Sequence, residues 1–95
     1  MAQNYSPEFL RDLRNRILID LLITEGLNIP FKQRDGYLRF LCPMCGDFHT
    51  ATNQKTNLAR CFRCQKNFNP IDMVMTVRQC TFIESVQFLT PLLQV

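Results

Sequence analysis

The sequence lacks the features that carry a protein into or across a membrane. It has no run of about 18 apolar residues, the length at which a membrane-spanning helix becomes possible. Residues 1–16 hold several charged side chains and no apolar stretch before a small-residue cleavage site, so they do not form a signal peptide. We therefore expect a cytoplasmic protein, in a compartment where thiols stay reduced.

Internal repeats and low-complexity tracts are also absent from the 95 residues. A chain of this length folds as one domain with a modest core, which a bound metal or a disulfide often stabilises. We predict an α+β fold and a single domain over 1–95. It comprises an N-terminal helical segment at 1–26, a zinc ribbon at 27–68 and a helical C-terminal segment at 69–95.

Cysteine is the residue that stands out, because two Cys-x-x-Cys pairs lie fifteen residues apart. The pairs are Cys42/Cys45 and Cys61/Cys64. Two intervening residues let one tight turn aim both sulfurs at one ion, and structural zinc prefers four such ligands. Gly46 suits a positive φ after the first pair. A four-thiolate iron–sulfur cluster is the alternative that the spacing leaves open.

Two other residues bear on this metal site. His49 follows Cys45 by four residues and is the alternative ligand, although the first turn is complete without it. Cys80 stands alone and is interpreted as a small buried hydrophobic residue. Four cysteines fill every position around one structural Zn²⁺, whereas a catalytic zinc keeps one position open. We therefore predict that the zinc is not catalytic.

Helix signals occur at both ends of the chain. Ser6 and Pro7 predict a helix start, and apolar residues at helical spacing carry the helix to about residue 25, with Gly26 as a left-handed cap. The sequence leaves open whether this helix bends or breaks near Asn15. Asn69 followed by proline predicts a second helix, and another begins near residue 81, with a proline disrupting its end.

The middle of the chain predicts strands at 37–41, 48–52 and 58–62, in one small antiparallel sheet with the metal at one end. A turn is expected at residues 35–36, an Asp-Gly pair. The aromatic residues expected in the core are Phe31, Phe40, Phe68, Phe82 and Phe88.

Positive charge gathers in this middle segment. Residues 30–69 hold seven basic side chains against two acidic ones, whereas each flank has a net charge of −1. Alternate strand residues share a face, so Tyr37 lies beside Arg39 and Arg60 beside Phe62. Cations and exposed aromatic rings are what single-stranded nucleic acid requires. The predicted nucleic-acid contacts are Tyr37, Arg39, Lys55, Arg60, Phe62, Arg63 and Lys66, and Lys32 and Arg34 can add contacts to phosphates.

The same motifs give the chain a family resemblance over roughly residues 17–89. It resembles the zinc-binding domain of bacterial DNA primases, which has a Cys-Pro-x-His first knuckle and a Cys-Phe-x-Cys second knuckle. Residues 42–45 and 61–64 match these knuckles, with Cys45 in place of the family histidine. Residues 82–86, Phe-Ile-Glu-Ser-Val, match a later segment of the family.

The resemblance implies contact with a single-stranded DNA template in replication or primer synthesis, with replication proteins as further partners. It also suggests a bacterial, phage or mobile-element origin. The chain departs from the family in a shorter stretch between the knuckles and in having no acidic cluster for nucleotidyl transfer before Val95. For this reason we predict that the chain is not an enzyme and is at most an accessory to primase activity. An alternative function is a protein-interaction adaptor on the same zinc scaffold, docking through the apolar faces of its first and last helices. The oligomeric state stays open.

Overall fold

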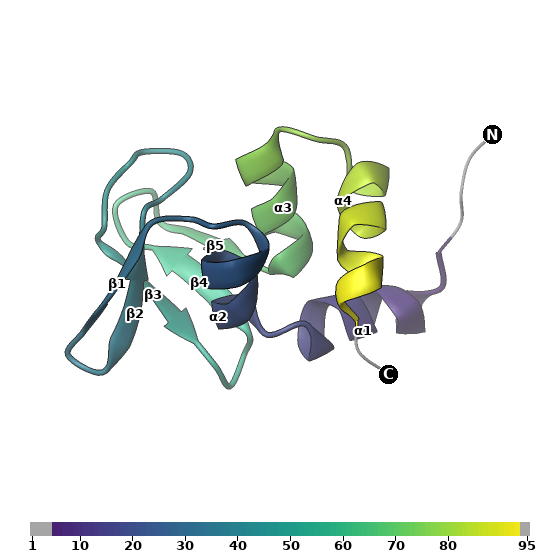
Figure 1. Cartoon of the computed structure of the whole chain (residues 1–95), viewed down its shortest axis with the longest axis horizontal. Coiled ribbons are helices and arrows are strands. Elements are labelled where there is room, and N and C mark those ends of the chain that lie inside the picture. Colours follow the sequence, from purple (N-terminus) through teal and green to yellow (C-terminus); the bar gives the residue numbers. More distant parts are fainter. Residues whose placement is uncertain (1–4, 94–95) are drawn as a thin grey trace.

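Helices and strands occupy separate stretches of the chain, as the α+β prediction requires. The computed structural model describes residues 5–93. Five short strands lie in the middle of the chain, with α1 and α2 before them and α3 and α4 after them (Figure 1). The molecule is elongated, 43 × 25 × 21 Å, with the strands at one end and α1, α3 and α4 at the other (Figure 1).

The N-terminal helical segment is broken. Helix α1 spans Pro7–Arg16, and the Ser6 Oγ accepts a hydrogen bond from the Phe9 N–H at 3.1 Å, as expected of a cap. The backbone is extended at residues 17–18, two residues beyond the bend left open at Asn15. Helix α2 (Ile19–Leu21) and a π-helical turn, η1 (Leu22–Gly26), follow. The left-handed residue is Asn28, with φ 52°, so the prediction of Gly26 as a left-handed cap was wrong.

A buried asparagine fixes this break. The Asn57 Oδ1 accepts from the Ile19 N–H at 2.8 Å. Its Nδ2 donates to the carbonyls of Arg14 and Ile17, at 2.6 and 2.7 Å. The side chain thus serves backbone groups on both sides of the break and ties the helical segment to the turn between β3 and β4.

The strands form two antiparallel sheets rather than the single predicted sheet. The first pairs β1 (Phe31–Arg34) with β2 (Tyr37–Phe40), and the second has the order β3-β4-β5. Strand β3 spans Thr50–Asn53, β4 spans Leu58–Cys61 and β5 spans Lys66–Phe68. Predicted strands 37–41 and 58–62 match β2 and β4 closely. The sequence prediction missed β1 and β5.

A threonine side chain joins the two sheets. The fully buried Thr50 hydroxyl donates to the Phe40 carbonyl at 2.7 Å and accepts from the Phe40 N–H at 2.8 Å. These bonds replace the backbone ladder that would otherwise continue the sheet from β2 to β3. Strand β3 also begins two residues later than predicted, because the Asp47 carboxylate accepts from the His49 N–H at 2.7 Å and closes a turn there.

The C-terminal helices begin where the sequence predicts. Helix α3 spans Pro70–Arg78 with Asn69 as its cap, and α4 spans Phe82–Leu89 with Thr81 as its cap. Both starts are capping boxes, in which the cap and the third helical residue bond each other's backbone N–H. Pro91 lies in a 3-10 turn, η2 (Thr90–Leu92), where a disruption was expected.

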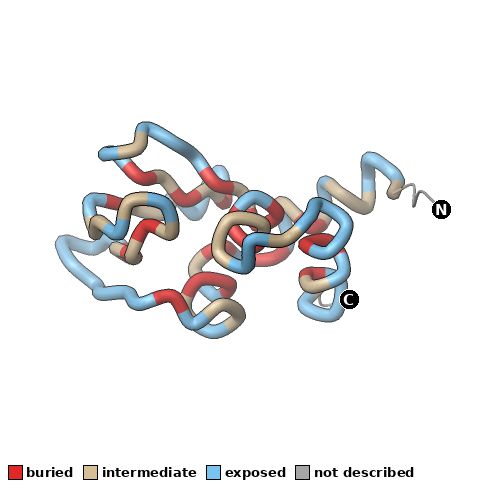
Figure 2. The backbone as a smooth tube through the Cα atoms, turned by 90° about the horizontal axis from the view of Figure 1, so that it is seen from above, coloured by how far each residue is buried: buried red, intermediate tan, exposed pale blue. Residues whose placement is uncertain are grey.

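One hydrophobic core runs through helices and strands alike, and buried positions are spread along the whole molecule (Figure 2). Phe40 and Phe68 are buried as predicted, and Phe88 packs against the core. Phe31 and Phe82 are 47% and 41% exposed, so their assignment to the core was wrong. Phe31 lies on an edge strand, and Phe82 begins α4 one turn before the first buried residue of that helix. Across the described residues, no helix has the length and apolar character that crossing a membrane demands.

Candidate metal centre and the adjoining aromatic and basic face

The first cysteine pair lies in a tight turn directly after β2. The Gly46 N–H donates to the Cys42 carbonyl at 2.9 Å, and the Cys42 N–H donates to the Asp47 carbonyl at 3.0 Å. The Met44 N–H points at the Cys42 Sγ, at 3.4 Å. Gly46 has the positive φ that the sequence predicts, 72°. The turn therefore aims Cys42 and Cys45 to the same side.

The second pair repeats this arrangement after β4. Cys61 ends the strand, and the Cys64 N–H points at the Cys61 Sγ at 3.3 Å. Gln65 occupies the place that Gly46 has in the first turn and is left-handed as well, with φ 56°. A residue with a Cβ costs about 1–2 kcal/mol in this conformation, so the requirement for the turn outweighs the local strain.

The two turns bring all four sulfur atoms together, as predicted. All four Sγ atoms lie within 4.8 Å of one another. The Cys42–Cys64 and Cys45–Cys61 sulfur separations are 3.9 and 3.6 Å. Tetrahedral zinc with Zn–S bonds of about 2.3 Å would hold its sulfurs about 3.8 Å apart, so the cluster fits one structural Zn²⁺.

The electrostatics of the four sulfurs favour a bound cation. Burial raises the pKa of the Cys42 thiol. Hydrogen bonding to Cys45, with a smaller contribution from burial, raises the pKa of Cys64 to about 12. Burial opposes ionisation of Cys61 as well, but the Cys64 N–H and the neighbouring thiols lower its pKa overall. Four adjacent thiolates repel one another, and a divalent metal ion removes that penalty.

The two competing residues lie outside this cluster. Among residues 5–93, the sulfur group contains neither His49 nor Cys80. The exposed His49 ring instead packs at a tilt of 43° against the Phe62 ring, with centroids 5.3 Å apart. The Cys80 Sγ is partly buried and 3.7 Å from the Val74 carbonyl, which agrees with a packing role.

Beside the metal cluster, aromatic and basic side chains line two adjoining recesses along the strands. The smaller one, about 360 Å³, is lined by Tyr37, Arg39, His49, Ala51 and Phe62. The larger, an open groove of about 930 Å³, shares Tyr37 and Phe62 with it and adds Arg60 and Lys55. We call the two recesses together the aromatic groove.

Cation–ring contacts order this groove. The Arg39 guanidinium lies 5.5 Å from the Tyr37 ring, and the Arg60 guanidinium lies 5.7 Å from the Phe62 ring. Arg39 also donates to the Thr50 carbonyl at 2.7 Å, and Arg60 donates to the Asn67 Oδ1 at 3.1 Å. Tyr37 and Phe62 remain 52% and 41% exposed. The rings are thus held in place with an open surface.

A comparison with protein families finds that the CHC2 zinc finger model matches residues 5–95. The chain belongs to the CHC2 zinc finger family of DnaG-type primases. This match confirms the resemblance, and no catalytic domain is identified. A comparison with curated proteins finds no match.

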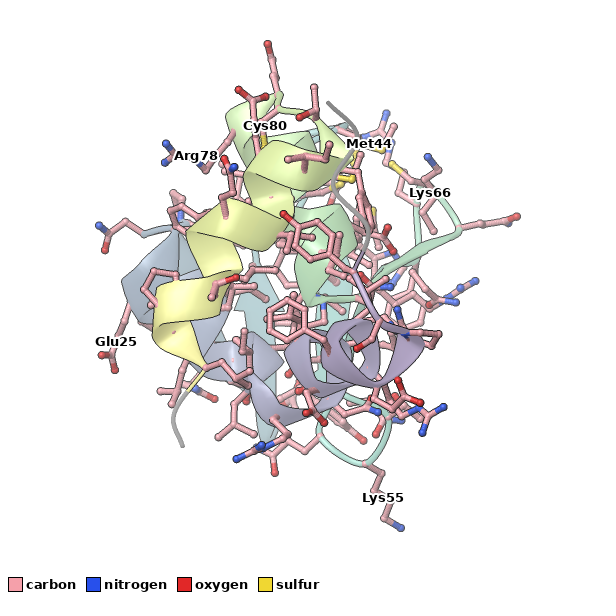
Figure 3. All side chains as sticks on the ribbon, turned by 90° about the vertical axis from the view of Figure 1, so that its right-hand side faces the viewer. Glu25, Met44, Lys55, Lys66, Arg78 and Cys80 are labelled. Carbon is pink, nitrogen blue, oxygen red and sulfur yellow. The ribbon has the colours of Figure 1, made fainter. Side chains whose placement is uncertain are left out.

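In this CHC2 zinc finger, two predicted nucleic-acid contacts lie outside the aromatic groove. Arg63 forms an ion pair with Asp47 at 3.2 Å, beside the first cysteine turn. The pKa of Asp47 is lowered, first by the His49 N–H and then by Arg63. Lys66 borders a separate recess against α3. Figure 3 shows Lys66 near Met44, on the side of the sulfur atoms, and Lys55 at the opposite end of the view.

The sequence analysis of this zinc finger did not identify Asn67, which lines the larger recess. It also did not place Lys32 and Arg34 on a particular face of the strands. Lys32 is opposite Arg39 in the β1–β2 register, and Arg34 is opposite Tyr37, so all four share one face. The Asp-Gly turn at residues 35–36 contained this information, because a two-residue turn fixes the pairing on either side of it.

Proposed function

We propose that this zinc finger binds single-stranded nucleic acid, with single-stranded DNA as its ligand, and acts as a non-catalytic accessory in primer synthesis or replication. The observation that carries the proposal is the convergence of Tyr37, Arg39, Arg60 and Phe62 in one groove. Membership of a primase zinc finger family supports it. Cys42, Cys45, Cys61 and Cys64 would hold one Zn²⁺ as a scaffold for this face.

The chemistry favours single strands over duplexes. Exposed rings flanked by guanidinium groups offer stacking surfaces to bases and charges to the phosphates between them. A base in a duplex is already stacked, so Tyr37 and Phe62 have no ring face of the nucleic acid to contact. Lys55, at the rim of the groove, extends the positive track toward the turn between β3 and β4.

The adaptor alternative is less well supported. It requires free apolar faces on the first and last helices, but Leu13 of α1 and Val86 and Leu89 of α4 are fully buried in the core. These buried faces already stabilise the fold, and the exposed apolar residues of α4 are limited to Phe82 and Ile83 in its first turn.

A mobility-shift titration of the zinc-loaded protein tests the proposal. The ligands are single-stranded and double-stranded DNA oligonucleotides of equal length, followed over a series of salt concentrations. Phe62→Ala should weaken single-strand binding at least about fivefold, because stacking on one ring contributes about 1–3 kcal/mol. Arg60→Gln should weaken binding and reduce the slope of log K against log salt by about 0.7, since one phosphate contact is lost.

The matched control is Arg11→Gln, which removes the same charge from an exposed position on α1. It should leave both the affinity and the salt slope close to those of the unchanged protein. Equal effects of Arg11→Gln and Arg60→Gln, or no binding at low salt, would contradict the proposed groove.

A further inference from the structure

Strand β1 leaves one edge of the molecule open. Among residues 5–93 it pairs with β2 alone, and all four of its residues are exposed. Residues 30–37 form a continuous exposed run. Figure 2 shows pale blue, exposed stretches of the chain at the strand end of the molecule.

The register shows which backbone groups point outward. Hydrogen-bonded and non-bonded pairs alternate along an antiparallel ladder. The Leu41 N–H donates to the Pro30 carbonyl at 2.9 Å, so Lys32 and Arg34 are the β1 residues that bond to β2. Phe31 and Gln33 therefore direct their N–H and C=O groups away from β2. The same alternation turns the Phe40 N–H and C=O away from β1, and both bond to Thr50.

Outside the β1–β2 ladder, no hydrogen bond from the described part of the chain reaches Phe31 or Gln33. The edge thus presents two donors and two acceptors at strand spacing. Its side chains alternate in character as well. Lys32 and Arg34 lie on one face, whereas Phe31 lies on the other and is 47% exposed.

We propose that β1 accepts an extended segment of a partner protein as an added antiparallel strand, and that this segment alternates acidic with apolar residues. Acidic side chains would lie opposite Lys32 and Arg34, and an apolar one would lie opposite Phe31, because directly opposed residues share a face. The Lys32 ammonium, now 4.6 Å from the Phe48 ring centroid, would gain a carboxylate partner.

The positive charges on β1 favour an acidic partner strand over a second copy of the chain. A second copy of the chain would place the cations of one β1 against those of the other, and like charges opposite each other are unfavourable. Lysine on an edge strand discourages pairing with neutral and basic strands for the same reason. An acidic strand is the partner that these charges attract.

The probe is an eight-residue peptide that alternates glutamate with valine, with both ends blocked, added to the zinc-loaded protein. We expect it to shift the NMR amide signals of Phe31 and Gln33 and to slow their hydrogen exchange. Two control peptides should not bind: lysine in place of glutamate, and the same residues arranged as a glutamate block and a valine block. No binding by the alternating peptide, or shifts at Tyr37, Arg60 and Phe62 of the aromatic groove with none at Phe31, would overturn the proposal.

Two modified peptides test the backbone pairing without altering the protein. Valine residues lie opposite Phe31 and Gln33, so N-methylation of the valines removes the donors that β1 requires and should weaken binding at least tenfold. N-methylation of the glutamates affects groups that point away from β1 and should leave binding within about twofold. Equal binding of both modified peptides would overturn strand addition.

A protein variant gives the complementary test. Gln33→Pro removes an outward donor that takes no part in the ladder, and proline is tolerated on the open edge of a sheet. It should weaken peptide binding at least tenfold, whereas Gln33→Val, which keeps the donor, should bind like the unchanged protein. Zinc content and amide spectra verify that both variants fold, and unchanged binding to a folded Gln33→Pro would count against the proposal.

Discussion

At the scale of single residues, Asn57 links two distant parts of the chain through its side chain. It is only 7% exposed and makes three hydrogen bonds to the helical segment more than 35 positions earlier in the chain. It is also left-handed, with φ 55°, a conformation that asparagine adopts more easily than other side-chain-bearing residues. Both properties depend on asparagine, and alanine supplies neither.

Asn57→Ala should therefore lower the free energy of unfolding by about 3 kcal/mol, because buried backbone groups lose their partners. Urea denaturation of the zinc-loaded protein measures this change. Asn15→Ala, at an exposed position on α1, is the control and should stay within about 0.5 kcal/mol of the unchanged protein. Equal losses in the two variants would show that the bonds of Asn57 do not stabilise the helix break.

At the scale of the element, the start of α4 contains a titratable group. The Thr81 N–H donates to the Glu84 Oε1 at 2.9 Å, and this bond to the charged form lowers the pKa of Glu84 below its ordinary value of 4.5. A lowered pKa in the folded state means that the carboxylate stabilises the folded protein fully above about pH 4.5. That contribution is lost as the pH falls through the lower, folded-state pKa.

An NMR titration of the Glu84 side-chain carboxyl should accordingly give a midpoint below 4.5. In Thr81→Ala the midpoint should move upward, because the hydroxyl that pairs with Glu84 is removed, although the backbone N–H remains. A midpoint at or above the ordinary value in the unchanged protein would show that the capping box does not form in solution.

Helix starts were predictable from sequence because a cap is a local device. Ser6, Asn69 and Thr81 each bond a backbone N–H three residues ahead, so a few adjacent residues determine the result. The break after α1 was not predictable in the same way. It depends on Asn57, whose distance in the sequence hides the contact.

Strands β1 and β5 were not predicted because they lack the alternation of hydrophobic and polar residues that marks half-buried strands. All four residues of β1 are exposed, and in β5 only Phe68 is buried. Pairing with β2 and β4 makes them strands, and a pairing partner is a tertiary property. The error at Phe31 has the same origin, since an edge strand leaves its aromatic side chain uncovered.

In the candidate site, too, local features were predictable from sequence and tertiary contacts were not. The cysteine cluster followed from spacing alone, because each pair closes within one turn. The placement of Tyr37 and Arg39 together, and of Arg60 with Phe62, followed from strand alternation. The sequence did not show that Arg63 lies outside the groove. Arg63 is paired with Asp47, and that ion pair forms only when the two cysteine turns meet.

At the scale of the whole molecule, the cysteine cluster and the hydrophobic core are continuous. Cys42 and Cys61 are 2% and 0% exposed and belong to the same buried cluster as Phe40, Ala59 and Phe68. The two cysteine turns connect the end of β2 to the end of β4, so a metal ion there links the two sheets. Thr50 provides the second link between them.

Removal of zinc should therefore unfold the chain cooperatively rather than loosen one loop. Structural zinc contributes about 10–16 kcal/mol in small domains, which is comparable to the typical stability of a folded protein, about 5–15 kcal/mol. Elemental analysis should find one zinc ion per chain, and a chelator titration should abolish far-ultraviolet circular dichroism and amide dispersion together. Cys64→Ser should behave like the chelated protein, whereas Cys80→Ser, outside the cluster, should keep its zinc and its spectrum. Native amide dispersion in the zinc-free protein would mean that the core alone holds the sheets together, and that the four cysteines have a role other than structural support.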